Sequence, residues 1–123
     1  MTRNRAPGRT LTRALAGAGG LWGLALLARP RAVVRALCPE LPGDRLWLAR
    51  VLGARLVVQH GLVLVAPEAS VVRAAAAVDL LHAASMVPLL GSRRYRRAAL
   101  ISGGVAGAFS AAYAAVTPAL GTP

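Results

Sequence analysis

Ionisable side chains stand in the middle of two strongly apolar stretches, residues 46–66 and 70–90, where a membrane helix tolerates them least. The candidate polar cluster consists of Arg55, Gln59, Asp79 and His82. A carboxylate, a guanidinium and an imidazole inside a bilayer are the groups of a proton or ion relay. The same charges also suit a structural pair that fixes helix register. We favour the structural pair, because opposite charges at matched depth neutralise each other without a ligand, and the relay is the alternative.

The depth match follows from the turn between the two stretches. Pro67 to Ser70 interrupts the apolar pattern and predicts a bend. Arg55 lies about 13 residues before this bend and Asp79 about 11 residues after it, so a rise of about 1.5 Å per residue puts them at similar depth. We therefore expect two helices folded back on each other with an Arg55–Asp79 pair between them.

The two histidines and the single cysteine offer little for a metal or cofactor. Metal sites need three or four convergent ligands, and the chain has neither an HExxH nor a CxxC spacing. His60 and His82 lie at different distances from the bend, so we do not expect them to share a metal. We expect no catalytic residue, no metal ligand and no cofactor, with each histidine hydrogen-bonded inside the bundle. The alternatives are a relay partner beside Asp79 and a ligand in a membrane-bound redox or haem enzyme.

The composition points to the bilayer as the solvent of this chain. Of its 123 residues, 56% are hydrophobic and only 15% are charged, and its mean hydropathy is +0.55. A water-soluble domain of this length needs more charged surface. The sequence also contains no nucleophile elbow and no phosphate-binding loop, so we expect a membrane protein without enzymatic activity.

The hydropathy pattern predicts an all-α, four-helix transmembrane bundle with spans at about 11–29, 46–66, 70–90 and 98–116. We expect one integral membrane domain over residues 1–123. Residues 1–13 are predicted to be a flexible basic tail, because Pro7 and Gly8 oppose a continuous helix. Residues 30–45 are predicted to form a partly interfacial connection. The first span is expected to be retained, although a basic segment before a short apolar run also resembles a secretory signal.

All fifteen cations are Arg, and the net charge is +11. Most of these Arg residues flank apolar segments, which is typical of contact with anionic lipid head groups and not of a nucleic-acid surface. We expect a multi-pass protein of the inner (plasma) membrane. The Arg distribution leaves the orientation open, because both sides of a four-span bundle would carry basic residues.

Small residues recur at four-residue spacing in the apolar spans. Ala16 with Gly20, and Gly19 with Gly23, do so in the first span, and Gly103 with Gly107 in the last. Such spacing lets helices approach closely in lipid, although an Ala-rich and Gly-rich chain also produces it by chance. We expect homo-oligomers that associate through these faces.

Three features of the sequence resemble a family of small four-span membrane proteins from high-GC bacteria, of the DUF4267-like kind. They are the segment Arg50-Val-Leu-Gly-Ala-Arg55, Asp79, and the Ala-Arg-Pro-Arg sequence after the first span. The resemblance covers residues 14–116 and implies an integral four-helix membrane protein. It brings no activity with it. We therefore expect a structural or partner-binding bundle held by Arg55 and Asp79. The alternative is a small dimeric transporter or proton-coupled carrier that uses Asp79, Arg55 and His82.

Overall fold

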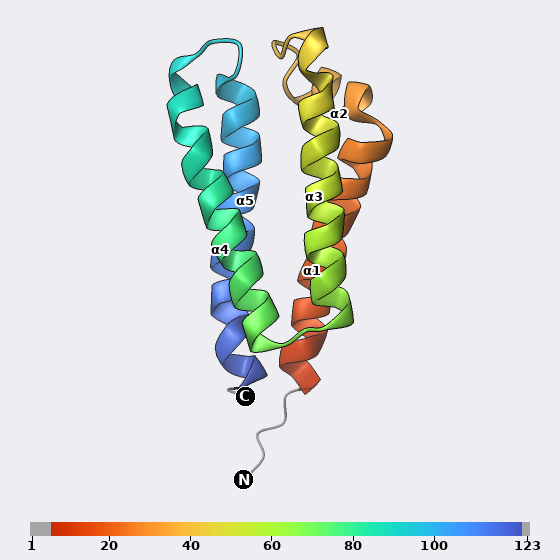
Figure 1. Ribbon diagram of the computed structural model, residues 1–123, viewed down its shortest axis with the longest axis vertical. Coiled ribbons are helices and arrows are strands. Elements are labelled where there is room, and N and C mark those ends of the chain that lie inside the picture. Colours follow the sequence, from red (N-terminus) through yellow and green to blue (C-terminus); the bar gives the residue numbers. More distant parts are fainter. Residues whose placement is uncertain (1–5, 122–123) are drawn as a thin grey trace.

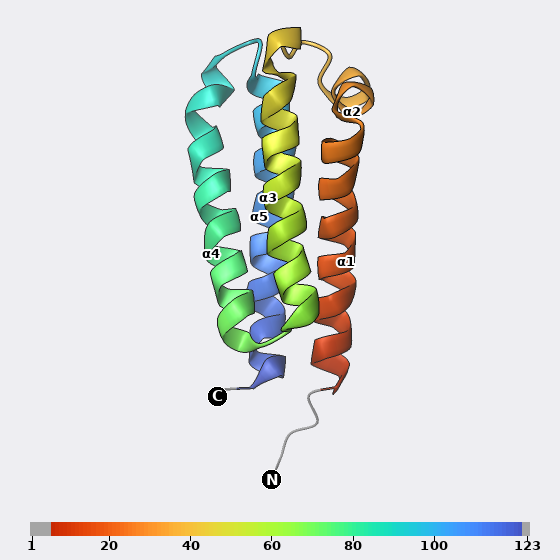
Figure 2. The same cartoon turned by 45° about the vertical axis from the view of Figure 1, so that its right-hand side comes forward.

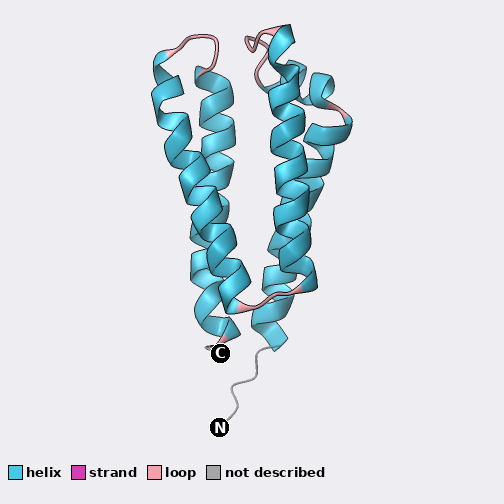
Figure 3. Cartoon of the chain, in the orientation of Figure 1, coloured by secondary structure: helices cyan, strands magenta, loops and turns pink. Residues whose placement is uncertain are grey.

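The computed structural model describes residues 6–121 of the chain, and every regular element among them is a helix (Figure 3). The long helices are α1 (Ala6–Ala28), α3 (Leu46–Val65), α4 (Ala69–Met86) and α5 (Arg96–Val116). The shorter ones are α2 (Pro30–Leu37), η1 (Gly43–Arg45), η2 (Val87–Gly91) and η3 (Thr117–Leu120). The predicted all-α bundle is confirmed.

Four helical segments are long and apolar enough to cross a membrane. They are Ala6–Ala28, Gly43–Val65, Ala69–Gly91 and Arg96–Leu120, with mean hydropathies of 1.3 to 1.6. Each has 23 to 25 residues, which at about 1.5 Å per residue exceeds the roughly 30 Å hydrocarbon core. The chain is therefore a small multi-pass helical membrane protein.

The long helices form two antiparallel pairs. α1 packs against α3, and α4 packs against α5 (Figures 1 and 2). The described ends of the chain and the α3–α4 bend lie at one end of the bundle (Figure 1). α2 and the α4–α5 connection lie at the other end. α3 and α4 converge at the bend and diverge toward that far end.

Glycines set the close approach of α1 and α3. A Cβ on Gly53 would lie 2.6 Å from the backbone oxygen of Gly23, and a Cβ on Gly23 would lie 2.8 Å from the Cβ of Leu56. A Cβ on Gly19 would collide with the ring of His60. The Gly19–Gly23 spacing in the sequence is thus used for helix contact inside one molecule.

Two apolar clusters form the core. The cluster near the bend joins α1, α3, α4, α5 and η3, and its fully buried members are Ala16, Val63, Val72 and Tyr113. The cluster near the far end joins α1, α2 and α3 through Leu26, Val34, Cys38, Ala49 and Leu56. The core near the far end therefore draws its buried residues from one side of the bundle.

The first span differs from the prediction at its start. Residues 6–13, predicted as part of a flexible basic tail, form the first two turns of α1, while residues 1–5 lie outside the described part. Pro7 is the second residue of the helix, where its missing N–H would have no acceptor within the helix. Gly8 lies against Ala119 of η3, and Thr12 is fully buried. Packing on the C-terminal segment thus orders this basic stretch.

The packing of the central hairpin also differs from the prediction. α3 and α4 are consecutive and antiparallel, but each packs along its length on another helix, α3 on α1 and α4 on α5. The glycines of α1 and α3 account for the first of these two pairings, because they allow close backbone contact between the two helices.

Candidate functional site

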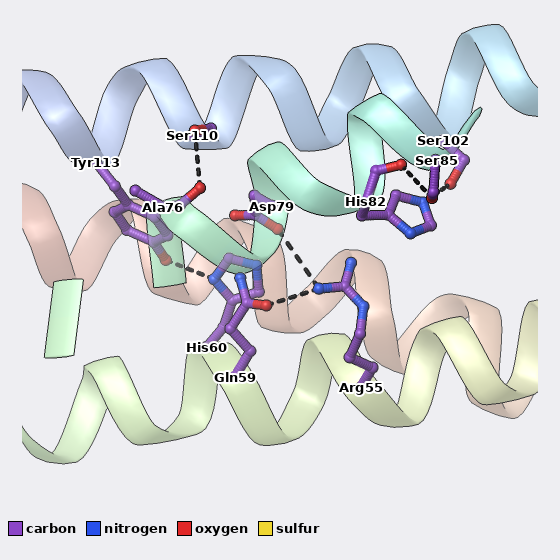
Figure 4. A network of polar contacts seen from close by, with 10 residues as sticks. All are labelled: Arg55, Gln59, His60, Ala76, Asp79, His82, Ser85, Ser102, Ser110 and Tyr113. Atoms are coloured by element: carbon purple, nitrogen blue, oxygen red, sulfur yellow. Dashed lines mark hydrogen bonds and ion pairs between the residues drawn. The ribbon is translucent and has the colours of Figure 1, made fainter. Parts of the chain in front are cut away.

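A polar bridge connects the two helix pairs near the middle of the bundle. Arg55 of α3 points toward α4, and Asp79 of α4 points toward α3 (Figure 4). The Arg55 Nη1 atom lies 3.7 Å from Asp79 Oδ1 and donates a 2.7 Å hydrogen bond to Gln59 Oε1. The side chain of Asp79 is 1% exposed and that of Arg55 is 28% exposed. Opposite charges thus meet between the two helix pairs.

Several polar atoms of this bridge have no hydrogen-bond partner. They are Arg55 Nε and Nη2, Gln59 Nε2, and both carboxylate oxygens of Asp79. A guanidinium has five N–H donors, and buried polar atoms are nearly always bonded. The bridge therefore holds its helices by charge attraction more than by hydrogen bonds, and it keeps unused donors and acceptors inside the bundle.

His60 forms a second connection between the helix pairs, closer to the bend. Its Nδ1 atom is hydrogen-bonded to the hydroxyl of Tyr113 on α5 at 2.5 Å. The ring also lies 4.9 Å from the ring of Phe109, centroid to centroid. His60 and Tyr113 are both fully buried, and Gly19 of α1 makes room for the imidazole. This contact matches the prediction of a histidine hydrogen-bonded within the bundle at Nδ1, whereas the buried Nε2 atom has no hydrogen-bond partner in the described part of the chain.

His82 lies one turn along α4 from Asp79 but turns to another partner. Its Nε2 atom is hydrogen-bonded to Ser102 Oγ of α5 at 2.5 Å, and Figure 4 shows the ring beside this hydroxyl. His82 therefore fastens α4 to α5 within one pair. The structure brings Arg55, Gln59 and Asp79 together and directs His82 to a separate contact.

An apolar cavity of about 350 Å³ lies between the two helix pairs. It extends from the Arg55–Asp79 bridge toward the end of the bundle where α2 lies. Helices α1, α2 and α3 line one wall, and α4, η2 and α5 line the other. Arg55, His82 and Ser102 border its inner end. The rest of the lining is nearly all apolar, so the accessible surface suits hydrocarbon better than a polar solute.

Cys38, the one cysteine of the chain, lines the outer part of this cavity just after α2. Burial raises the pKa of its thiol above the ordinary value, and the charge of Glu40 raises it further. The charge of Arg97 acts in the opposite direction. A raised thiol pKa makes Cys38 a poor nucleophile and a poor metal ligand near neutral pH.

Metal-binding residues do not gather within residues 6–121, where no group of three or more His, Cys, Asp or Glu side chains could hold an ion. His60 and His82 have separate partners on α5. The candidate site therefore consists of the Arg55–Asp79 charge pair, the hydrogen bonds of the two histidines and the apolar cavity.

Sequence reasoning missed both hydroxyl partners of the histidines. Tyr113 and Ser102 stand in a span without any charge, where small residues dominate the pattern. Counting residues from the α4–α5 connection would have paired His82 with Ser102. His82 and Ser102 are each about ten residues from the middle of the α4–α5 connection, a matched depth of the kind that links Arg55 with Asp79.

Comparisons of the chain with family models, with curated proteins and with solved structures find no match. The resemblance to the DUF4267-like family thus stays a prediction. What the structure supports is the coarser description of a small four-span helical membrane protein.

Proposed function

We propose that this protein is a non-catalytic helical bundle of the plasma membrane, with a structural or partner-binding role, whose two helix pairs are joined by Arg55 and Asp79. The main support for this proposal is the distance of 3.7 Å between Arg55 Nη1 and Asp79 Oδ1. This contact joins α3 and α4, which diverge from the bend (Figure 1). A lone Asp or Arg at mid-bilayer costs about 2.5 to 3.5 kcal/mol on insertion scales. Pairing the charges lowers this cost and gives the bundle a specific register.

Association with further copies belongs to this proposal. Gly104, Ala108, Ala111 and Ala115 form a small-residue face on α5 that is exposed in the single chain. Gly107 beside them has open space at its Cβ position. In lipid, such a face favours close contact with another helix. Contact of the flanking Arg residues with anionic head groups completes the proposed set of partners.

A carrier function is the second candidate, favoured by the cavity that ends at Arg55 and His82. A carrier needs Asp79 to change its charge or its partner during a transport cycle, whereas a structural pair needs it to stay charged and paired.

The substitution Asp79→Asn separates the two candidates, because it keeps the side-chain shape and removes the charge. Expression, gel filtration in mild detergent and thermal unfolding of this variant measure the fold. Loss of folded protein is the result expected from the structural role. A well-folded variant that loses proton-coupled uptake in vesicles would support the carrier and contradict our proposal. Asp44→Asn serves as the comparison, since it makes the same exchange at an exposed acid outside the charge pair.

A further inference from the structure

The cavity between the helix pairs has the size and chemistry of a site for a hydrocarbon chain. Its volume of about 350 Å³ is within the range of roughly 300 to 1,000 Å³ typical of ligand sites. Its walls are formed by side chains such as Leu26, Val34, Leu52, Met86 and Leu89. The unused donors of Arg55, Nε and Nη2, are themselves buried, so they present little polar surface to an occupant.

The cavity opens sideways toward the bilayer. Leu48 and Val51 of α3 line it and are also 40% and 59% exposed on the surface of the molecule. α3 and α4 diverge on this side of the polar bridge (Figures 1 and 2). A lipid chain can therefore pass between α3 and α4 without crossing water.

The end of the bundle around the cavity is strongly basic. Exposed cations there come from the segment around α2 and from the α4–α5 connection, namely Arg29, Arg31, Arg35, Arg45, Arg93, Arg94, Arg96 and Arg97. The acidic residues of the same segments are Glu40 and Asp44. Arg97 acts electrostatically on Cys38, which lines the cavity, so its charge reaches the outer part of the site.

We propose that this cavity binds one acyl chain of an anionic phospholipid, whose phosphate lies among the Arg side chains at the α2 end of the bundle. The apolar walls receive the chain, and the basic rim selects a head group with net negative charge. This inference rests on the membrane-spanning bundle and not on the proposed role of Asp79.

Fluorescence quenching of Trp22 tests the site directly, because Trp22 lines the cavity. The chain has two tryptophans, and Trp47→Phe leaves Trp22 as the single emitter. This variant, full-length and reconstituted in vesicles, receives phosphatidylglycerol brominated on its acyl chains at increasing mole fraction. Phosphatidylcholine with the same brominated chains is the reference. We expect phosphatidylglycerol to reach half-maximal quenching at the lower mole fraction.

Paired charge variants locate the head group. Arg94→Gln with Arg97→Gln removes two exposed cations beside the cavity, and Arg9→Gln with Arg73→Gln removes two at the opposite end. The first pair should raise the half-quenching mole fraction of phosphatidylglycerol by about tenfold. The second pair should leave it unchanged. Gel filtration and thermal unfolding verify that both variants keep the parent fold.

Three outcomes would overturn the proposal. Equal quenching by the two lipids would mean that Trp22 meets only the general lipid surroundings. An equal effect of both charge pairs would mean that bulk surface charge, and not the rim, sets the preference. Absence of quenching by either lipid, together with crosslinking of Leu48→Cys to a second copy, would show that a neighbouring protein chain fills the opening. Loss of fold in Asp79→Asn has no bearing on these results.

Discussion

Replacing Asp79 by Ala tests how much the polar bridge contributes to the bundle. At 3.7 Å and an effective dielectric constant of about 20, the attraction between Arg55 and Asp79 is about 4.5 kcal/mol. Removing one partner of a buried pair typically costs about 3 to 5 kcal/mol, because the other charge stays behind without compensation. The Ala variant leaves Arg55 inside the bundle with Gln59 as its one hydrogen-bond partner. We expect its free energy of unfolding to fall by about 3 kcal/mol or more.

The assay is unfolding in mixed micelles with increasing mole fraction of dodecyl sulfate, followed by far-ultraviolet circular dichroism. Asp79→Ala, Arg55→Ala and the exchange of Arg55→Asp with Asp79→Arg form the series. The exchange restores opposite charges at the same depth, so it should recover most of the lost stability. Asp44→Ala removes an exposed acid from η1 and serves as the control, with an expected change within about 0.5 kcal/mol.

Two results would refute this reasoning. The first is a parent-like free energy of unfolding for Asp79→Ala, which would mean that the charges do not hold the helices. The second is an exchange variant less stable than both single variants, which would mean that their surroundings, and not their mutual attraction, fix these residues in place.

Three further predictions concern the packing and the buried hydroxyl and thiol groups. Gly53→Ala should lower the thermal unfolding temperature because its Cβ would meet the α1 backbone, whereas Gly61→Ala, with open space around it, should match or slightly exceed the parent. Tyr113→Phe should cost about 1 to 3 kcal/mol in the dodecyl sulfate assay, since it leaves the buried Nδ1 of His60 without its partner; an unchanged stability would contradict that contact. Alkylation of Cys38 by a maleimide in the folded protein should be slow near neutral pH, because burial raises the pKa of the thiol. The rate should rise only above the ordinary thiol pKa of about 8.5. A fast reaction at neutral pH would contradict the buried position of Cys38.

The architecture could be predicted because it depends on properties that act along the chain. Apolar runs long enough to span lipid give the four helices, and equal distances from one bend give the Arg55–Asp79 contact. Both arguments need only helix rise and hydropathy, and neither requires knowledge of which helices pack together.

The pairing of helices could not be predicted in the same way. Every apolar span except 70–90 contains glycines, and spacing alone does not reveal which glycine faces which backbone. The structure shows that Gly53 lies opposite Gly23, whereas Gly107 has open space beside it. The helical start of α1 was missed for a related reason, because Gly8 reads as a helix breaker until Ala119 is seen packed against it.

The spacing between α3 and α4 tests the central claim most directly. Val58→Cys and Leu81→Cys, introduced into a Cys38→Ala background, place one spin label on the exposed surface of each helix pair. Double electron–electron resonance between the two labels then reports the distance between the pairs. If the bridge joins the pairs, the parent gives one narrow distance distribution, Asp79→Ala gives a broader one, and the exchange of Arg55→Asp with Asp79→Arg restores the narrow one. A distribution for Asp79→Ala as narrow as that of the parent, at the same mean distance, would contradict the claim.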